Sequence, residues 1–467
     1  MRRYIALLAG AVLGLIAAGA PSASSQAATD VTRSGPDFTI EHVTVIDGTG
    51  AAPQPDMTVV VSGGRIVRLT PSKAAGPVRG RRLDGRGRFL IPGLIDAHIH
   101  LRGATPAKSP AEGFVIDHVA AHQALASYLY AGVTSVVDLG NQPELVLKAR
   151  AEERAGRILS PRIFATGNLI TYPGSHGDGM AIRITDFERD RALLDRHIAD
   201  QAPDIVKLTY EERGWGARPM ITLLPPDLMA RTLQYYNLYG IRTTVHVSSE
   251  RRALEAVAAG ADTLAHPVIQ GPVSESFVRL MAARKTPFVT TLTIGENYSR
   301  LVEHPEYLDE PLYVASFSPA ERQSLKTETR TAWQTQTWTW WMKVMTPVCQ
   351  DNIAKIVAAG GVAVLGTDQS NGPAVHREME LLARAGVSPL QILKIATLNG
   401  AVFLGREQDM GSITVGKLAD MVLLDRDPTL DIAHAKAITW VMKNGVLVDE
   451  AQLPMAGGPQ QRRWTGD

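Results

Sequence analysis

Apolar positions along the middle of the chain fall into short runs, and longer stretches with helical spacing separate these runs. The runs are rich in Val, Ile, Leu and Phe, which predicts buried strands. They occupy residues 89–98, 134–140, 162–167, 204–210, 242–247, 262–267, 287–293 and 362–368. The helical stretches between them include residues 114–131, 226–239 and 251–259. Eight strand–helix units in series predict an α/β fold, a (β/α)8 TIM barrel over residues 89–405.

The pattern changes on both sides of this segment. Residues 37–88 read as short strands and turns, among them "MTVVVSGGRIVRL", a hairpin with Gly63 and Gly64 at its turn. Similar text returns in residues 406–450, as in "ITWVMKNGVLVD". We expect these two segments to form one composite β-sandwich domain, with the barrel inserted between them. Residues 451–467 are polar and glycine-rich, and we expect a disordered tail.

The first residues have the pattern of a secretory signal peptide. Arg2 and Arg3 precede the apolar run Tyr4–Ala20, and Ser25–Ala27 fits the small-residue rule for cleavage. The alternative is a membrane anchor, but the apolar run is short for a spanning helix, which needs about 20 residues. We therefore expect residues 1–27 to be removed and the mature protein to be periplasmic or secreted, with no membrane span.

Composition narrows the classes of partner. The 48 basic and 47 acidic residues balance to a net charge of +1, so no nucleic-acid partner is indicated. Cys349 is the only cysteine, which excludes an intrachain disulfide. The Trp-rich stretch at residues 333–341 has two interpretations. It covers the barrel mouth or forms the interface of a homo-oligomer, or it is an ordinary helix with a buried aromatic stripe.

Six residues with metal-binding side chains come at or just after the ends of five predicted strands. They are His98, His100, Lys207, His246, His266 and Asp368. The active site of a TIM barrel lies where the carboxyl ends of its strands meet, so we expect these side chains at one rim. Alternate residues of a strand point the same way, which lets His98 and His100 act as a pair. Imidazole and carboxylate suit zinc, and also manganese, iron or cobalt. Lys207 can bind metal only when it is neutral or converted by carbon dioxide into a carbamate.

Taken together, these residues resemble a known family. "PGLIDAHIH", the later lysine, histidines and aspartate, and the closing stretches "ATLNGAVFLG", "GSITVGKLADMVLLD" and "VMKNGVLV" resemble the amidohydrolase superfamily of metal-dependent hydrolases. The chain looks most similar to the imidazolonepropionase-related group that includes Xaa-Pro dipeptidases. It departs from those dipeptidases after the lysine, where a glycine-rich stretch is usual and this chain reads "KLTYEERGWG".

The resemblance implies a role for each metal-binding residue. His98, His100 and Asp368 would hold the more buried of two divalent ions, with zinc as the default metal. His246 and His266 would hold the more exposed ion. N6-carboxylated Lys207 would bridge the two ions together with a hydroxide. Asp368 would orient that hydroxide, take its proton and pass it to the leaving group.

The implied reaction is hydrolysis of an amide or peptide bond in a small substrate, a dipeptide or an N-acyl amino acid. Alternatives on the same ligands are a lactonase, esterase or phosphotriesterase, and a deaminase or other cyclic C–N hydrolase. A binding protein without activity is a further alternative, but it would be expected to have lost ligands.

Three loop residues are candidates for contact with the substrate. His176 lies within "PGSHGDG", where the glycines allow close approach. Tyr210 can donate a hydrogen bond to a carbonyl oxygen, and Arg213 can pair with a substrate carboxylate. The alternative interpretation is that Tyr210 and Arg213 are solvated loop residues.

Overall fold

The computed structural model describes residues 37–77, 80–108, 113–213, 220–460 and 462. The predicted signal peptide, residues 1–27, lies outside the described residues. Among the described residues, no helix combines the length and the apolar character needed to cross a membrane.

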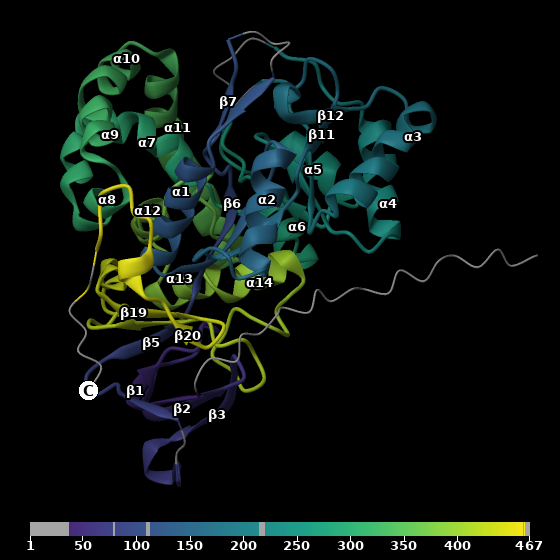
Figure 1. Ribbon diagram of the computed structural model, residues 1–467. Helices are drawn as coiled ribbons and strands as arrows, with labels where there is room; N and C mark the ends of the chain where they lie inside the picture. The colour runs from purple at the N-terminus through teal and green to yellow at the C-terminus, as the bar shows by residue number, and fades with distance from the viewer. Residues whose placement is uncertain (1–36, 78–79, 109–112, 214–219, 461, 463–467) are drawn as a thin grey trace, which may run out of the picture. The chain divides into compact units, whose positions relative to one another are not determined.

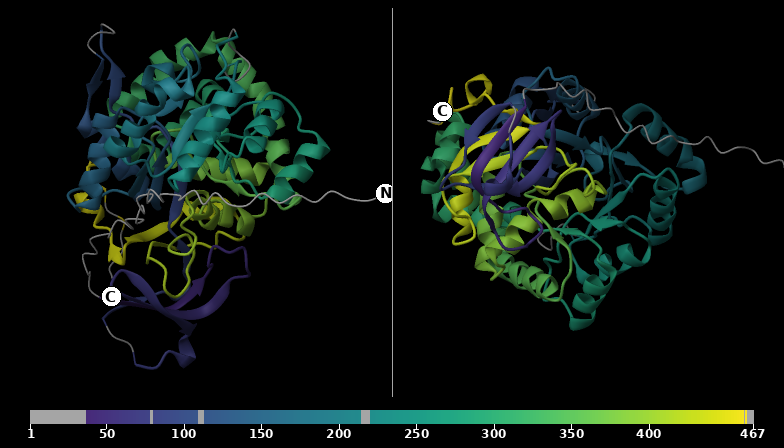
Figure 2. Two further views of the ribbon diagram at one scale, coloured as in Figure 1. Left: turned by 90° about the vertical axis from the view of Figure 1, so that its right-hand side faces the viewer. Right: turned by 90° about the horizontal axis from the view of Figure 1, so that it is seen from below.

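Strands from both ends of the chain form one sheet of eight strands (Figure 1). β20, β19, β18, β5, β1, β2 and β3 follow one another across it, and β4 pairs with β1. In the right-hand view of Figure 2 the purple and yellow strands overlap, in agreement with the pairing of β5 with both β1 and β18. Their bounds are β1 (Phe38–Val45), β2 (Gln54–Ser62), β3 (Arg65–Pro71), β4 (Arg81–Asp84), β5 (Phe89–Pro92), β18 (Met421–Leu424), β19 (Ile438–Lys443) and β20 (Val446–Leu447).

The central segment contains two parallel sheets, and every predicted strand is present in them. β6 (Leu94–Ile99), β9 (Val133–Asp138) and β10 (Arg162–Ala165) form one sheet. The other has seven strands in the order β12, β11, β13, β14, β15, β16 and β17. Its bounds are β11 (Leu169–Thr171), β12 (Ala181–Arg183), β13 (Val206–Thr209), β14 (Thr243–His246), β15 (Thr263–Leu264), β16 (Phe288–Val289) and β17 (Ala363–Val364). A small antiparallel pair, β7 (Ala104–Pro106) and β8 (Phe114–Ile116), follows β6 in the chain.

The run 89–98 was predicted as one barrel strand, and it is divided into β5 and β6. β5 joins the terminal sheet, and β6 joins β9. Gly93 lies between them, where a Cβ would be only 2.1 Å from Thr134 Oγ1. The absence of a side chain lets the backbone pass this close. The composite β unit therefore extends to Pro92 instead of ending at residue 88.

Helices connect the strands as the spacing predicted. The helices are α1 (His118–Tyr130), α2 (Pro143–Arg154), α3 (Phe187–Arg196), α4 (Pro226–Leu238), α5 (Glu250–Ala258), α6 (Glu275–Arg284), α7 (Leu292–Glu303), α8 (Pro311–Ser316), α9 (Pro319–Ser324), α10 (Arg330–Gln334), α11 (Thr337–Ala358), α12 (Pro373–Arg384), α13 (Pro389–Ile395) and α14 (Leu398–Leu404). Short 3-10 or π turns are η1 (Ser72–Ala74), η3 (Asp178–Met180), η4 (His197–Gln201), η6 (Pro305–Asp309), η7 (Leu325–Thr329), η8 (Ile432–Lys436) and η9 (Glu450–Gln452). α1 begins four residues later than predicted, because Asp117 caps it by accepting from the Ala120 amide at 3.0 Å.

The expectation of a disordered tail does not hold for residues 451–460. Leu453 and Met455 are buried, and the Gly457 amide donates to the Ala315 carbonyl at 3.0 Å. The composition of this segment did not predict its order, because the order depends on two apolar residues, Leu453 and Met455, that find a place in the core. Residue 461 and residues 463–467 lie outside the described residues.

Candidate metal centre

The six predicted metal-binding residues are brought together at the carboxyl ends of the parallel strands. His98 lies in β6, Lys207 in β13 and His246 at the end of β14. The other three follow β6, β15 and β17 by one, two and four residues respectively, and they are His100, His266 and Asp368. Strands that run the same way end at the same edge, so residues far apart in sequence meet there.

Four of these side chains meet at one point. His98 Nε2 is 3.4 Å from His100 Nε2, and Lys207 Nζ is 3.0 Å from the first and 3.5 Å from the second. Asp368 Oδ1 lies 3.6 Å from His98 Nε2 and 3.4 Å from His100 Nε2. The polar ends of all four therefore converge.

The backbone sets the orientation of the two paired imidazoles. His98 Nδ1 lies 2.9 Å from the Ala265 carbonyl oxygen, and His100 Nδ1 lies 2.7 Å from that of Gly140. A carbonyl oxygen only accepts, so each Nδ1 carries the proton and donates. Each Nε2 is left with a lone pair directed toward the convergence point. This arrangement is the usual outer shell of a metal-bound histidine.

Burial keeps these imidazoles neutral. It lowers the pKa of His98 and His266 well below the ordinary value, that of His100 to about 3 and that of His246 to about 4. Only a neutral imidazole can bind a metal ion. Desolvation therefore keeps the ligands in the state that binds metal at neutral pH.

Burial shifts the pKa of Lys207 and the pKa of Asp368 in opposite directions. It lowers the pKa of Lys207 to about 8, although Asp368 raises it, and it raises the pKa of Asp368 to about 6, although Lys207 lowers it. A lysine with this pKa has a sizeable neutral fraction near pH 8, and the neutral amine is the form that reacts with carbon dioxide. Asp368 also has a left-handed backbone with φ +52°, which aspartate tolerates better than most residues.

Two buried carboxylates outside the predicted set hold the strand ends in place. Asp96 accepts from the Thr367 hydroxyl at 2.7 Å and from its amide at 3.0 Å, which joins β6 to the loop carrying Asp368. Asp138 accepts from the Leu101 amide at 2.8 Å. Burial raises the pKa of Asp96 to about 8 and that of Asp138 to about 6. These residues were not found from the sequence, because their roles depend on contacts between strands.

The predicted substrate contacts have three different outcomes. His176 lies at the site, with its ring stacked on His246 at a centroid distance of 4.3 Å. The prediction for Tyr210 does not match the structure, because its hydroxyl donates to Glu255 Oε2 at 2.6 Å on the far side of the strand. Arg213 is exposed on the loop after β13, and its role stays a prediction.

Glu211 is a further residue of the site that was not predicted from the sequence. It is buried, with Oε1 3.0 Å from His176 Nδ1 and 3.2 Å from His246 Nε2. The signal for it was the alternation along the strand. Lys207, Thr209 and Glu211 share one face, and Tyr210 points the other way.

The side chains fall into two groups, each with ligand atoms within 4.8 Å of one another: His98, His266 and Asp368, and His176, Glu211 and His246. Each group combines two imidazoles with one carboxylate. Neutral imidazoles with one carboxylate are a donor set that zinc and related divalent ions favour, and the residues therefore fit a divalent metal centre.

Comparisons with known proteins agree with this chemistry. The model of the amidohydrolase family matches residues 89–448. An adenine deaminase of Cereibacter sphaeroides is 26% identical over 460 residues, covering 85% of this chain and 71% of that protein. An imidazolonepropionase of Streptomyces avermitilis is 24% identical over 424 residues, covering 83% and 84%. A solved Xaa-Pro dipeptidase with bound methionine superposes with a TM-score of 0.69 and 21% identity, covering 88% of this chain and 100% of that chain.

Proposed function

The chain belongs to the amidohydrolase family of metal-dependent hydrolases, and on that premise we propose that it cleaves an amide or peptide bond. The proposed substrate is small, a dipeptide or an N-acyl amino acid. Two divalent ions would serve the reaction, with zinc as the first to test and manganese, iron and cobalt as alternatives. The observation that supports this most is the pair of imidazoles whose Nδ1 atoms are held by carbonyl oxygens and whose Nε2 atoms converge.

Each residue of the centre has a defined task in this proposal. Divalent ions, when bound, act as Lewis acids and lower the pKa of a water molecule to ~7. His98, His100, His246 and His266 would hold the ions, and Lys207, once carboxylated, would offer two oxygens to them. Asp368 Oδ1 would accept a proton from the attacking water and return it to the leaving nitrogen.

A closed barrel is the fold we propose for the central segment. The Ala97 amide donates to the Leu365 carbonyl at 2.9 Å, and the Asp368 amide donates to that of His98 at 2.7 Å. These bonds join β17 to β6. At the other junction the Asp204 amide donates to the Ala165 carbonyl at 3.0 Å, linking β10 to the start of β13. Both sets of bonds support one (β/α)8 ring, with the terminal sheet as a separate sandwich domain.

A second candidate function is hydrolysis of a cyclic C–N bond or deamination. The relatives found by sequence, an adenine deaminase and an imidazolonepropionase, favour it. A solved structure at 21% identity supports the fold alone, so the dipeptide substrate rests on the resemblance of the sequence motifs.

The two candidates can be separated with one protein preparation. Metal analysis comes first, followed by a screen of dipeptides and N-acyl amino acids, with lactones, phosphotriesters, adenine and cyclic imides in parallel. We expect two ions per chain and turnover of amides. Ammonia release from adenine without amide turnover would favour the second candidate and reject the first. Amino-terminal sequencing of the exported protein would test the proposed cleavage after residue 27 and the periplasmic or secreted location.

A further inference from the structure

We propose that Glu211 and His176 are metal ligands, and that with His246 they hold the second ion of the centre. This inference rests on the two-metal part of the proposed function. It changes the ligand set that the resemblance implies, because His176 becomes a ligand and not a substrate contact. His266 lies with His98 and Asp368 in the other group whose ligand atoms are within 4.8 Å of one another.

The position of Glu211 is the first argument. Its side chain is 1% exposed and lies between two imidazoles, 3.0 Å from His176 Nδ1 and 3.2 Å from His246 Nε2. Its neighbour Glu212 has a different environment, since both its carboxylate oxygens bind the Arg252 guanidinium, at 2.8 and 3.0 Å. Glu212 thus forms an ordinary ion pair, whereas the adjacent Glu211 is directed between His176 and His246.

The support given to His176 is the second argument. Its carbonyl oxygen accepts from the Thr209 hydroxyl at 2.9 Å and from the Thr171 hydroxyl at 3.2 Å. These threonines belong to β13 and β11, so two strands hold the loop where His176 meets Glu211. A loop residue fixed in this way is pre-organised, as a metal ligand must be.

The chemistry of the set is the third argument. Two histidines and one glutamate form a known catalytic zinc set, which leaves the fourth position for water or substrate. Three of the other ligand residues, His98, His266 and Asp368, form a second set of the same composition. Lys207 lies 3.0 Å from His98 and 3.5 Å from His100, beside this second set.

Metal stoichiometry tests the proposal without relying on activity. Wild-type protein, Glu211→Gln and His176→Asn would be stripped with chelator, reloaded with zinc and measured by mass spectrometry. A competing chelator would give the affinity of each ion. Glu212→Gln is the matched control, since it neutralises the adjacent carboxylate outside the cluster. We expect two ions in the wild type and the control. The two site variants should retain one ion and bind the second at least 10–100-fold more weakly.

Two ions at wild-type affinity in both site variants would overturn the proposal, and so would a single ion in the wild type. Circular dichroism in chelator checks that Glu211→Gln folds. If it does not fold, Glu211→Asp keeps the carboxylate, and cobalt spectra of this variant should show a changed second site. A wild type that binds two ions but cleaves no amide would reject the proposed substrate and leave this assignment intact.

A separate observation concerns the size of the substrate. We infer that a cavity of about 250 Å³ beside the metal centre receives a large apolar side chain of the substrate, an inference that also rests on the proposed function. Arg102 and Gln369 form one wall, two residues after His100 and one after Asp368. The opposite wall is aromatic and comes from the segment after α7: Tyr307, Tyr313, Phe317 and Trp333.

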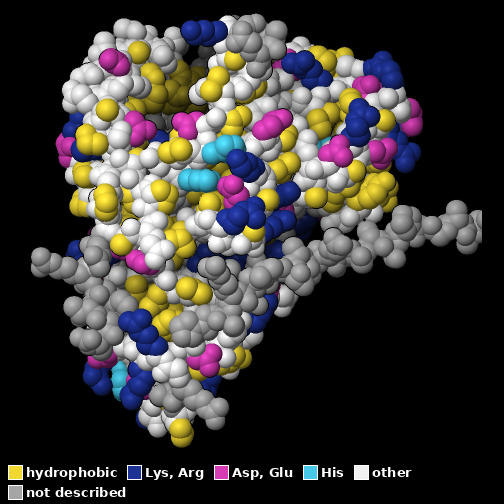
Figure 3. Space-filling view, viewed as in Figure 1, with side chains coloured by type: hydrophobic (Ala, Val, Ile, Leu, Met, Phe, Trp, Pro, Cys, Tyr) yellow, Lys and Arg dark blue, Asp and Glu magenta, His cyan; other side chains and the backbone are white. Residues whose placement is uncertain are grey.

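The aromatic part of the lining is the reason to expect an apolar group there. Arg102 is neutralised by Glu321 at 2.9 Å and faces the Phe317 ring at 5.8 Å, so it offers little charge to a ligand. The Trp333 ring packs on Tyr298 with centroids 4.5 Å apart. In Figure 3 a hollow bordered by hydrophobic side chains opens where Figure 1 places α10 and α11. The Trp-rich stretch thus contributes one residue to this wall, and Trp340 is 63% exposed on α11.

Trp333→Ala and the matched control Trp340→Ala test this cavity. With N-acetylphenylalanine against N-acetylglycine, we expect Trp333→Ala to lower kcat/KM about 10-fold or more for the first alone, the usual effect of a lost apolar contact. The control should change neither. Calorimetry of phenylalanine and glycine binding to the metal-loaded protein reads the same preference without turnover. Equal effects on both ligands, or none on either, would overturn the inference.

Discussion

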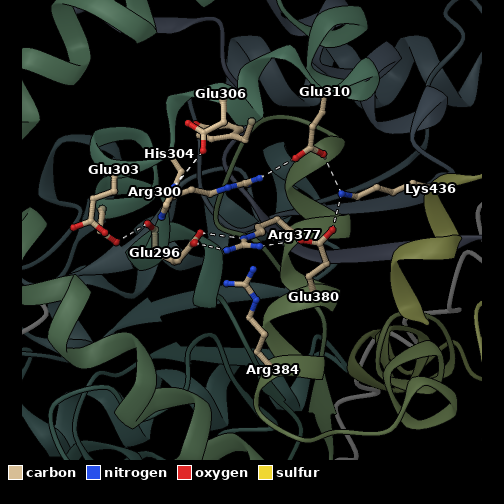
Figure 4. A pocket seen from close by; sticks show the side chains of 12 residues that line it. Glu296, Arg300, Glu303, His304, Glu306, Glu310, Arg377, Glu380, Arg384 and Lys436 are labelled. Atoms are coloured by element: carbon tan, nitrogen blue, oxygen red, sulfur yellow. Dashed lines mark hydrogen bonds and ion pairs between the residues drawn. The ribbon is translucent and has the colours of Figure 1, made fainter. Parts of the chain in front are cut away.

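Two regions of the molecule are rich in titratable side chains, and they use them in opposite ways. One is the metal centre. The other is a cleft of about 630 Å³ between α7, α12 and η8 (Figure 4). There the cations are matched by carboxylates. Arg377 donates to Glu296 at 2.5 Å and to Glu380 at 2.9 Å, and Lys436 pairs with Glu380 at 2.5 Å and Glu310 at 3.0 Å.

The metal centre shows a different balance. His98 and His100 direct their Nδ1 protons to backbone carbonyls, and their Nε2 lone pairs converge with the Asp368 carboxylate. Such a set gains from an added cation, whereas the cleft neutralises itself. The larger cavity is therefore the less informative one about function, and the direction of donor atoms is the better guide. We make four predictions about these two regions and give them from the largest expected effect of the substitution to the smallest.

Asp368→Asn should have the largest effect, because it removes both a metal ligand and the proposed proton acceptor. We expect kcat for amide hydrolysis to fall about 10³-fold, within the usual range for general acid–base groups. Steady-state kinetics with parallel metal analysis would measure it. Arg384→Ala, at the exposed edge of the cleft, is the control and should stay within about twofold. More than a tenth of wild-type activity in Asp368→Asn would contradict the assigned role.

Arg377→Leu should have a large effect on stability and none on metal binding. It leaves the poorly exposed Glu296 without its partner, and breaking a buried ion pair from one side costs about 3–5 kcal/mol. Urea unfolding would measure the loss. Removing both partners in Glu296→Leu/Arg377→Leu should recover part of it. A change in zinc stoichiometry would show that cleft and centre are not independent.

The buried His376 should make the protein less stable in acid. Burial lowers its pKa to about 4, and its Nε2 donates to the Ala131 carbonyl at 2.9 Å. Between pH 6.5 and 4 the unfolded chain binds a proton that the native chain does not. Stability therefore falls as pH falls through this window, by at most about 1.4 kcal/mol per pH unit. His376→Gln should flatten the difference between pH 7 and pH 5 in chelator-treated protein. An unchanged pH slope would mean that other groups dominate.

Glu303→Gln at the rim of the cleft should have the smallest effect. Its partner Lys343 is 57% exposed, and exposed ion pairs contribute about 0–1 kcal/mol. We expect a melting temperature within about one degree of the wild type and an unchanged metal content. A loss comparable to that of Arg377→Leu would show that the whole cleft is one cooperative network.

Much of the fold could be predicted from local pattern. Each of the eight strand runs contributes a strand to the parallel sheets, and the predicted strands at both chain ends meet in one sheet. What the pattern could not show was the division at Gly93, because that position depends on the close approach of Thr134 from β9. The order in residues 451–460 was also missed, since it depends on which core positions remain open.

The sequence by itself determined which residues end the strands, and so brought His98, His100, Lys207, His246, His266 and Asp368 into one expected site. The carboxyl ends of parallel strands lie at one edge of a sheet, so the local strand pattern is enough to predict that these residues meet. The tertiary structure alone decided which partners these side chains and their neighbours meet. Tyr210 points to Glu255, and Glu211, one residue later, points to His176 and His246. The physical reason is that alternation along a strand sets the face of a side chain, whereas its partners come from other strands and loops and are set only by packing.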